Sequence, residues 1–402
     1  MHINHISQNT NQCSGCGVCV ISCPCEAISF NRDDNGFYKP IVDECKCTGC
    51  GICRKVCYKF FNEKTPFENA FKDKPVYAAW SKDPAVVSAS SSGGVGYELT
   101  RHFFGVGYEV CGCVFDAPND DCKHIIAGSP EDLEAIRSSK YLQSNTIGAF
   151  SKFKKDKKYL VIGTPCQIYG LRQWIQMNQW EDNFILVDFF CHGTPSFNLW
   201  KKYKSHICEK HNIASAWNYV NFRRKYRNSG WHHYAVLIRD VADKELVKEN
   251  ASRNDLFFKF FLNNSCLNES CCYCKLRLDH CAADIRIADF WGRKYADNNA
   301  GVSLVIINTE VGKKTWDDVF EKLMVENCSY EDLLSSQPTR YLSMPAKRTA
   351  VLKALDGGQS LERIYRGFFG VSFPRRVLSH IKKTVKTVLK MGYKLFNTNR
   401  WK

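Results

Sequence analysis

The phrase CSGCGVCVISC (residues 13–23) returns with few changes as CTGCGICRKVC (residues 47–57), and this internal repeat decides the fold of the N-terminal part. In each copy, successive cysteines are separated by two, two and three residues. Between the copies, residues 27–30 and 37–42 flank an Asn35-Gly36 step. This pattern predicts a β-hairpin, because Asn-Gly accepts the positive φ values of a tight turn. A charged stretch around residues 62–75 separates this unit from the rest of the chain.

The cysteine spacing indicates iron–sulfur chemistry. Three thiolates in one tight loop surround three corners of a cubane, and the fourth is sent to the neighbouring cluster, as in bacterial two-cluster ferredoxins. Paired zinc sites are the alternative, but zinc modules usually use two separated C-x2-C pairs. The spacing therefore predicts two [4Fe-4S] clusters, one held by Cys13, Cys16, Cys19 and Cys57 and the other by Cys47, Cys50, Cys53 and Cys23.

Two further features of this unit depart from the repeat. Cys25 and Cys45 lie outside its register and are not expected to be ligands. Pro24 follows the fourth cysteine of the first copy, as the ferredoxin pattern prefers, whereas Tyr58 stands at the matching position of the second copy.

Length and composition fit a folded protein of two or three domains. The chain has 402 residues, 24% charged and 44% hydrophobic, which excludes disorder throughout. Its 22 cysteines are more than packing needs. The first residues lack the apolar core of a secretory signal, and no apolar run approaches the roughly 18 residues of a membrane span. We therefore expect a cytoplasmic protein with reduced thiols.

The positive charge is concentrated at the C-terminal end. The formal net charge is +15, and residues 371–402 carry nine basic residues and no acidic one. Apolar residues recur there at helical spacing, which predicts a basic amphipathic helix. Peripheral contact with the inner face of a membrane, docking to an acidic partner and a merely solvated helix all remain open for it. Nucleic-acid binding is not expected, since no recognised nucleic-acid-binding fold accompanies the charge.

From residue 76 onward, strand and helix patterns alternate, which indicates a mixed α/β layer. The patterns predict strands over residues 106–115, 159–163, 184–190, 217–224, 231–241, 284–288 and 302–307, and helices over residues 167–177 and 197–211. Residues 88–97 gather serine and glycine before a predicted helix. They form either a phosphate-binding turn or a plain loop.

A second group of cysteines follows predicted strands. Cys166 lies at the start of a helix and Cys191 directly after the next strand, where the ends of adjacent parallel strands meet. Cys271 and Cys274 form a separate C-x2-C pair. These four residues could hold a third cluster. A buried or nucleophilic thiol at each position is the alternative, and the spacing does not decide between them.

Five dispersed phrases carry a specific resemblance. SSSGGVG (90–96), SKYLQS (139–144), GTPCQIYGLR (163–172), CHGTPS (191–196) and ADIRIADFWG (283–292) resemble the coenzyme F420 hydrogenase/dehydrogenase beta-subunit family, over residues 76–345. The resemblance implies an FAD-binding domain that carries a [4Fe-4S] cluster. It implies flavin contacts from Ser91, Ser92, Gly93, Gly94, Lys140 and Gln143. It also implies cluster ligation by Cys166, Cys191, Cys271 and Cys274, although Cys272 and Cys281 crowd the same segment.

The expected fold class is α+β. It comprises a small bacterial-ferredoxin-like domain (residues 1–65), a larger mixed α/β flavin-binding domain (76–345) and a basic helical tail (346–402). The resemblance implies an oxidoreductase that passes electrons between a redox partner, the clusters, FAD and a small-molecule substrate or hydride carrier. A non-catalytic electron-relay subunit and a zinc-bound scaffold are the rival interpretations. The substrate, the direction of electron flow and the oligomeric state are not encoded in the matched phrases.

Four polar residues of these phrases are candidates for moving the proton that accompanies hydride chemistry: His192, Lys140, Tyr141 and Asp289. Each could equally be a scaffold residue that makes hydrogen bonds. Arg223, Arg224 and Lys225 could clamp an anionic ligand, although a charge run is more often a solvated strand end.

Overall fold

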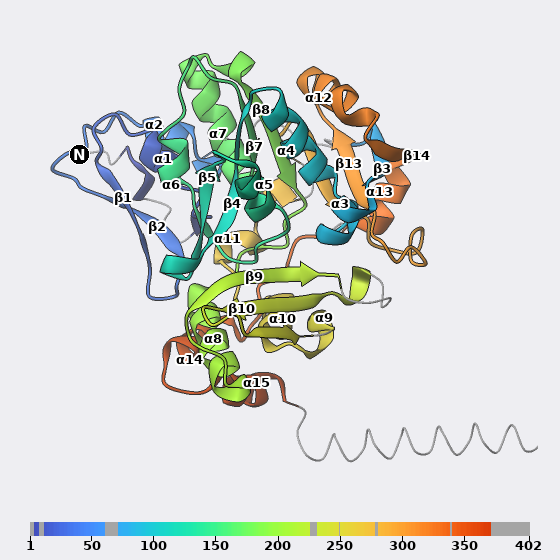
Figure 1. Cartoon of the computed structure of the whole chain (residues 1–402). Coiled ribbons are helices and arrows are strands. Elements are labelled where there is room, and N and C mark those ends of the chain that lie inside the picture. Colours follow the sequence, from blue (N-terminus) through green and yellow to red (C-terminus); the bar gives the residue numbers. More distant parts are fainter. Residues whose placement is uncertain are drawn as a thin grey trace, which may run out of the picture.

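The computed structural model describes residues 4–7, 12–60, 71–225, 231–248, 250–277, 280–337 and 340–370. The charged stretch around 62–75 lies partly, and the basic segment 371–402 wholly, outside these residues. Within them the chain is an α+β protein with a large mixed sheet, a small antiparallel sheet and an N-terminal unit (Figure 1). None of the described helices is long and apolar enough to cross a membrane.

The N-terminal unit is built from two similar halves around a hairpin. Each half has a short helix that begins after a glycine with positive φ, Gly17 (80°) before α1 and Gly51 (75°) before α2. The predicted hairpin is confirmed, with Ile28 opposite Val42 and a turn closed by the Gly36 N–H donating to Asp33 O at 2.8 Å. The elements are α1 (Val18–Ile21), β1 (Ile28–Arg32), β2 (Tyr38–Val42), α2 (Ile52–Lys55) and the 3-10 turn η2 (Tyr58–Phe60).

The large sheet has nine strands in the order β14-β3-β13-β12-β8-β7-β4-β5-β6. Its centre, from β12 through β8 and β7 to β4, is parallel, and both flanks contain antiparallel pairs. The strands are β3 (Val76–Ser81), β4 (Glu109–Asp116), β5 (Asp121–Ile126), β6 (Ser144–Asn145), β7 (Tyr159–Ile162), β8 (Phe184–Phe189), β12 (Ile285–Asp289), β13 (Ser303–Ile307) and β14 (Leu323–Cys328).

Helices cover both faces of this sheet. On one face, α4 and α12 pack over an apolar cluster that includes Leu99, Val305 and Trp316. On the other face, α7 and α6 pack against α1, so the N-terminal unit adds a further layer. The helices of this part are α3 (Pro84–Ala89), α4 (Val95–Gly105), α5 (Pro130–Ile136), α6 (Ile147–Phe150), α7 (Pro165–Asn178), α12 (Glu310–Phe320) and α13 (Tyr330–Ser336).

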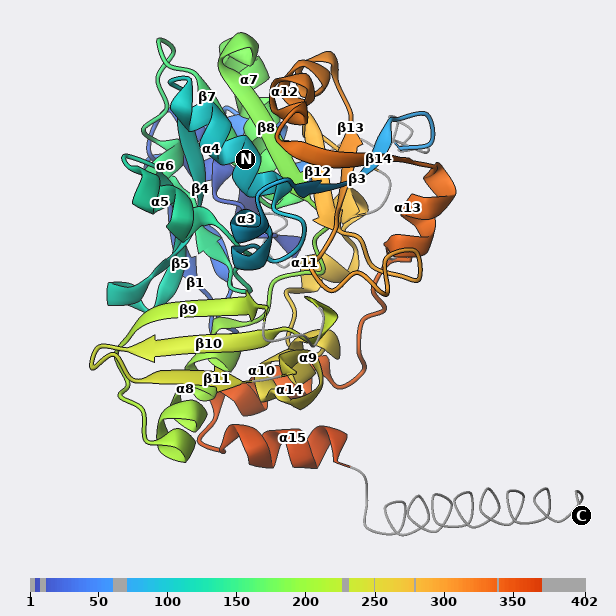
Figure 2. The same ribbon diagram turned by 45° about the vertical axis from the view of Figure 1, so that its right-hand side comes forward.

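The small sheet lies beneath the large one and carries its own helices (Figure 2). Its strands are β9 (Trp217–Arg224), β10 (Ala235–Asp240) and β11 (Glu245–Lys248). The helices are α8 (Phe197–His211), α9 (Ala251–Asn254), α10 (Leu256–Leu262), α11 (Glu269–Cys272), α14 (Arg348–Asp356) and α15 (Leu361–Phe369). They enclose an aromatic core around the fully buried Trp200, Phe257 and Trp217. Residues 348–369, which the sequence prediction places in the tail, contribute Val351, Leu352, Leu355, Leu361 and Ile364 to this core.

The predicted strands and helices of both sheets are confirmed within a few residues, with two differences at strand starts. Gly107 has a φ of +91° and ends α4, so the strand predicted from residue 106 begins at Glu109 instead. The strand predicted from residue 231 begins at Ala235, because residues 231–233 form a 3-10 turn. The buried Trp231 of this turn stacks on Trp291 with ring centroids 4.8 Å apart.

One buried histidine of the sheet predicts a pH effect on stability. His124 on β5 is 3% exposed, packs against Phe150 and has its Nε2 3.3 Å from Ile162 O. Burial lowers its pKa to about 4, so the unfolded chain takes up a proton at higher pH than the folded one. As the pH falls from 6.5 to 4, stability is expected to drop by up to about 3 kcal/mol from this residue.

The variant His124→Phe should lose this part of the pH dependence, because it keeps an aromatic ring but cannot bind a proton. Chemical denaturation of both proteins at pH 7, 5.5 and 4.5 measures it, since all other titrating groups are shared. An identical slope of stability against pH in the two proteins would contradict the assignment.

Candidate functional site

Five cysteines of the N-terminal unit line one cavity. Cys23, Cys47, Cys50 and Cys53, here called the outer set, surround a solvent-open space of about 340 Å³. They come from both copies of the repeat, as the crossed ligand pattern predicts. The Ala27 N–H donates to the Cys23 Sγ at 3.3 Å, a contact typical of the backbone donors that surround cluster sulfurs. Cys25 also lines this space, and Cys45 is exposed at the surface.

Cys13, Cys16, Cys19 and Cys57, the middle set, lie deeper. Burial raises the pKa of Cys19 well above its usual value, and the neighbouring thiols Cys16, Cys13 and Cys57 raise it further. The Gly15 N–H donates to the Cys13 Sγ at 3.2 Å. The structure therefore brings these four thiols together across the repeat.

Cys166, Cys191, Cys271 and Cys274, the inner set, line a third space of about 600 Å³. Cys166 is held in the first turn of α7, where Thr164 and Gln167 form a capping box and Pro165 starts the helix. Cys191 follows β8, and the Asn268 side chain caps α11, which contains Cys271. Residues 166 and 191 thus meet at one sheet edge, as predicted from the parallel strands.

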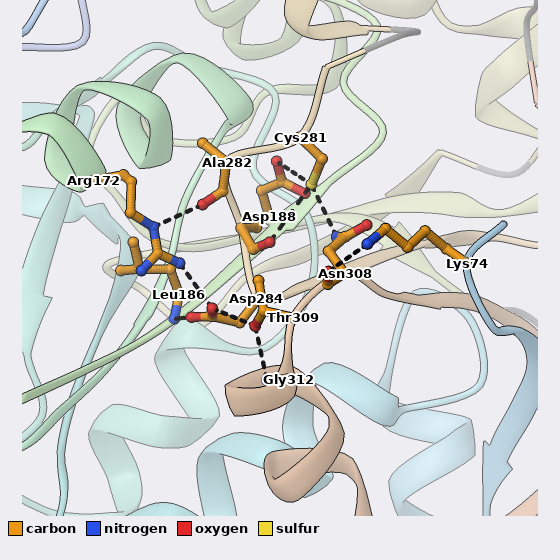
Figure 3. Close-up of polar contacts among 11 residues, drawn as sticks. Lys74, Arg172, Leu186, Asp188, Cys281, Ala282, Asp284, Asn308, Thr309 and Gly312 are labelled. Carbon is orange, nitrogen blue, oxygen red and sulfur yellow. Dashed lines mark hydrogen bonds and ion pairs between the residues drawn. The ribbon is translucent and has the colours of Figure 1, made fainter. Parts of the chain in front are cut away.

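The neighbouring cysteines of the inner set lie elsewhere. Cys281 contacts Asp188, with both carboxylate oxygens 3.8 Å from its Sγ, and its Sγ accepts a hydrogen bond from the Asn308 Nδ2 at 3.0 Å (Figure 3). Cys272 is buried on α11, and neither residue is among the described residues that line the 600 Å³ space. Cys271 and Cys274 therefore line the inner-set cavity, whereas Cys272 and Cys281 do not.

Hydrogen bonds join the N-terminal unit to the inner set. The Asn268 Nδ2 donates to Cys13 O at 3.1 Å. The Gln143 side chain accepts from the Tyr38 N–H at 2.8 Å and donates to Ser14 O at 2.9 Å. Ser14 and Gly15 themselves line the inner-set cavity. The cysteine loop of the middle set is therefore fixed against the wall of the inner set.

The middle set lies between the other two. Besides burial, the inner-set thiol of Cys166 is the largest contribution to the raised pKa of Cys16. At its other side, Cys53 of the outer set adds to the raised pKa of Cys19 and of Cys57. Thiols must lie close together to influence one another in this way. The three sets therefore form a series from the exposed Cys50 to the half-buried Cys191.

The donor chemistry of these sets fits iron–sulfur clusters. Burial, followed by neighbouring thiols, raises the pKa of Cys166 to about 12 and that of Cys191 well above its usual value. Buried thiols of this kind ionise only when positive charge is bound among them, which iron supplies. Among the described residues, no group of three or more His, Cys, Asp or Glu side chains lies close enough to hold a metal ion directly.

Ion pairs connect the matched phrases to one another and to β8. Arg172 of GTPCQIYGLR pairs with Asp284 of ADIRIADFWG at 2.8 Å, and Asp284 also accepts hydrogen bonds from the Leu186 N–H and the Thr309 hydroxyl (Figure 3). Arg286 donates to both oxygens of Asp188, at 2.7 and 2.6 Å. These charged residues hold α7, β8, β12 and the start of α12 in register, and so position the ends of β7 and β8 that carry Cys166 and Cys191.

The four predicted proton-transfer residues lie in three different places. His192 lines the inner-set cavity, its Nε2 lies 2.7 Å from Asn264 Oδ1, and burial lowers its pKa to about 4. Tyr141 and Asp289 meet through Arg223, whose Nη1 donates to them at 3.1 and 2.7 Å. Burial alone would lower the pKa of Arg223, but the neighbouring Asp289 carboxylate has a larger, opposite effect. The pKa of Arg223 is therefore raised above its usual value.

Lys140 lies apart from these residues. Its ammonium group donates to Ala135 O, Ile136 O and Arg137 O, the carbonyl oxygens at the end of α5. Burial lowers its pKa to about 8. The positive charge of Lys140 therefore lies at the C-terminus of α5, where the helix dipole makes a cation favourable.

The predicted flavin contacts are also divided. Ser91 to Gly94 precede α4, with the Gly93 N–H donating to Ser303 Oγ at 3.0 Å and the Ser139 N–H donating to Ser91 Oγ at 3.2 Å. The second contact brings the SKYLQS phrase beside the serine loop. Gln143 instead belongs to the junction with the N-terminal unit. Arg224 and Lys225 line a separate solvent-open space of about 1360 Å³.

Sequence reasoning missed several residues that the structure places at the thiols. Asn268, Arg277 and Tyr58 have no motif of their own, and Arg277 and Tyr58 line the inner-set cavity. Of these three residues, only Tyr58 is marked in the sequence, because it stands where the ferredoxin pattern prefers a second proline.

The fold and site define an α+β protein in which thiols gather at the junction of an N-terminal unit and a large mixed sheet. Residues 156–332 match the family model that describes the C-terminal part of the beta subunit of coenzyme F420 hydrogenase/dehydrogenase. This match confirms, for residues 156–332, the resemblance seen in the sequence.

Individual relatives are more distant. An uncharacterized protein of Methanocaldococcus jannaschii is 26% identical over 210 residues, 45% of this chain and 56% of the relative. The coenzyme F420-dependent sulfite reductase of the same organism is 29% identical over 168 residues, 40% of this chain and 25% of the relative. The match thus spans about half of one relative and a quarter of the other. A chain of the F420-reducing [NiFe] hydrogenase complex from Methanosarcina barkeri is 16% identical with a TM-score of 0.43, covering 75% of this chain and 92% of its own length.

Proposed function

We propose that this chain is an iron–sulfur flavoprotein oxidoreductase that carries electrons between a redox partner and a small-molecule substrate or hydride carrier. The observation that supports this most is that twelve cysteines lie in three neighbouring groups of four. The middle set lies next to both the outer and the inner set. The family match supports a redox role, and one relative is a coenzyme F420-dependent reductase.

The outer and middle sets are proposed to hold the two [4Fe-4S] clusters of a ferredoxin-type domain, and the inner set a third. Clusters exchange single electrons and a flavin converts between one- and two-electron chemistry, which is why such a protein would need both. Residues of this chain would position the clusters relative to one another. Asn268 and Gln143 hold the cysteine loop of the middle set against the cavity of the inner set. The buried guanidinium of Arg277 offsets thiolate charge there.

For FAD we propose contacts from residues 91–94, where a serine and glycine turn meets the N-terminus of α4, a favourable place for phosphate. The Arg223–Asp289–Tyr141 group lies against this turn, because the Arg223 Nη2 donates to Ser91 O at 3.4 Å. Asp289 and Tyr141 are the proposed proton-handling groups, since both carry polar atoms already joined by one cation. Lys140 and Gln143 support the neighbouring loops.

Anaerobic purification tests the proposal directly. We expect coloured protein with about twelve iron atoms and as many acid-labile sulfides per chain, and one releasable flavin. Iron and sulfide without flavin would favour the relay interpretation instead. Colourless protein that contains zinc would overturn the proposal.

A further inference from the structure

Tyr58 connects the middle and inner sets. It directly follows Cys57 of the middle set and begins the 3-10 turn Tyr58–Phe60. Its side chain lines the cavity of the inner set, together with Cys166, Cys191, Cys271 and Cys274. The first copy of the repeat has Pro24 at the matching position, and proline has no side-chain hydrogen-bond donor. The second copy of the repeat therefore has a potential hydrogen-bond donor, Tyr58, beside the inner set, where the first copy has a proline.

The hydroxyl group of Tyr58 is buried and lacks an acceptor. Its oxygen has almost no contact with solvent, and no atom of the described residues accepts a hydrogen bond from it. A buried donor left unpaired is unfavourable, so a structure that retains one usually satisfies it with a group bound at the site. The only acceptors that this cavity would gain on binding a cluster are thiolate and sulfide sulfurs.

Cys274 is the inner-set thiol that acts most strongly on the Tyr58 hydroxyl, and both residues line the same cavity. Burial raises the pKa of Cys274, and the Tyr58 hydroxyl, which lies nearby without forming a hydrogen bond of ordinary geometry, opposes that rise. The reverse effect is also present, since burial and then the Cys274 thiol raise the pKa of Tyr58. The ring is fixed from two sides, by Tyr169 with centroids 6.0 Å apart and by the Lys59 Nζ 4.7 Å from the ring centroid.

We propose that the Tyr58 hydroxyl donates a hydrogen bond to the Cys274 thiolate when the inner set holds its [4Fe-4S] cluster, and that this bond raises the reduction potential of that cluster. The inference rests on the proposed function, because it needs a cluster at the inner set. Hydrogen bonds to cluster sulfurs stabilise the reduced, more negative state. Tyr58 is therefore a positioning residue that makes the inner cluster easier to reduce, which favours electron flow toward it from the middle set.

The test is Tyr58→Phe, which keeps the ring and removes only the hydroxyl group. In an anaerobic reductive titration followed by electron paramagnetic resonance, the inner cluster is identified as the signal that Cys271→Ser removes. We expect Tyr58→Phe to lower the equilibrium constant for one-electron reduction of this cluster about tenfold, which corresponds to about 59 mV. The control Tyr77→Phe alters a tyrosine stacked on Trp316, in the apolar cluster on the α4 side of the large sheet, and should leave all potentials unchanged.

The outcomes separate this inference from the proposed function. An unchanged potential in Tyr58→Phe at full iron content overturns the role of Tyr58 and leaves the proposed function standing. Wild-type protein with only about eight iron atoms, and no signal that depends on Cys271, overturns both. Should Tyr58→Phe fail to fold, resonance Raman spectra of the wild type in H2O and D2O decide. A deuterium shift of an Fe–S stretching band that depends on Cys274 supports the bond, and its absence overturns it.

Discussion

Replacing Arg286 with methionine is expected to lower the free energy of unfolding by about 3–5 kcal/mol, the largest effect predicted for a single substitution outside the thiols. Arg286 and Asp188 are both buried, with side chains 0% and 1% exposed, and are joined by two hydrogen bonds. Methionine fills much of the same volume but leaves the Asp188 carboxylate without its partner in a site that burial already makes unfavourable for charge. The loss of stability therefore comes from the unpaired Asp188 carboxylate rather than from poorer packing.

Chemical denaturation measures this loss, and the chain offers a matched control. Lys294 pairs with Asp332 at 2.7 Å, but these side chains are 37% and 27% exposed. Lys294→Met should therefore change stability by less than about 1 kcal/mol. The double variant Arg286→Met with Asp188→Leu should recover much of the loss, because no charge stays buried alone. Equal destabilisation in the single and double variants would contradict this explanation.

Replacing Cys53 with alanine is expected to remove one cluster, about four of twelve iron atoms, and to loosen the N-terminal unit. Cys53 is buried and lines the outer-set cavity with Cys23, Cys47 and Cys50. Since metal binding and folding of such small units are coupled, the loss of one ligand acts on both.

Iron and sulfide analysis measures the loss of the cluster, and limited proteolysis within residues 12–60 measures the loosening. Cys45→Ala is the control, since Cys45 belongs to the same segment but is exposed. It should keep full iron content. Cys53→Ala protein with undiminished iron, or Cys45→Ala protein that loses as much, would refute the assignment of the outer set.

Local features of the sequence predicted much of the fold. The Asn35-Gly36 turn produces the hairpin β1–β2 because its backbone preference acts over a few residues. The strand at 159–162 and the helix at 197–211 follow from apolar periodicity in the same way. The spacing of the repeat also predicts the two N-terminal thiol sets, by the crossed ligand pattern of two-cluster ferredoxins, and this assignment stays a prediction.

Contacts between distant segments were not predictable from local patterns. Arg172 and Asp284 are 112 residues apart, and Arg286 and Asp188 are 98 apart. Three of the five matched phrases contain charged residues, and nothing in those phrases says whether the charges serve chemistry or hold strands together. Lys140 illustrates this, because the resemblance implies a flavin contact, and the structure shows its ammonium group at backbone carbonyls at the end of α5.

The sequence by itself determined the α+β class, the hairpin unit and the repeated thiol pattern, because propensity, turn chemistry and spacing are properties of neighbouring residues. Only the tertiary structure decided which cysteines of the large domain meet, and that the phenol after Cys57 reaches their cavity. It also decided that residues 348–369 belong to a buried core. These outcomes depend on the order of strands in the sheet and on desolvation, which arise only when segments far apart in the chain pack together.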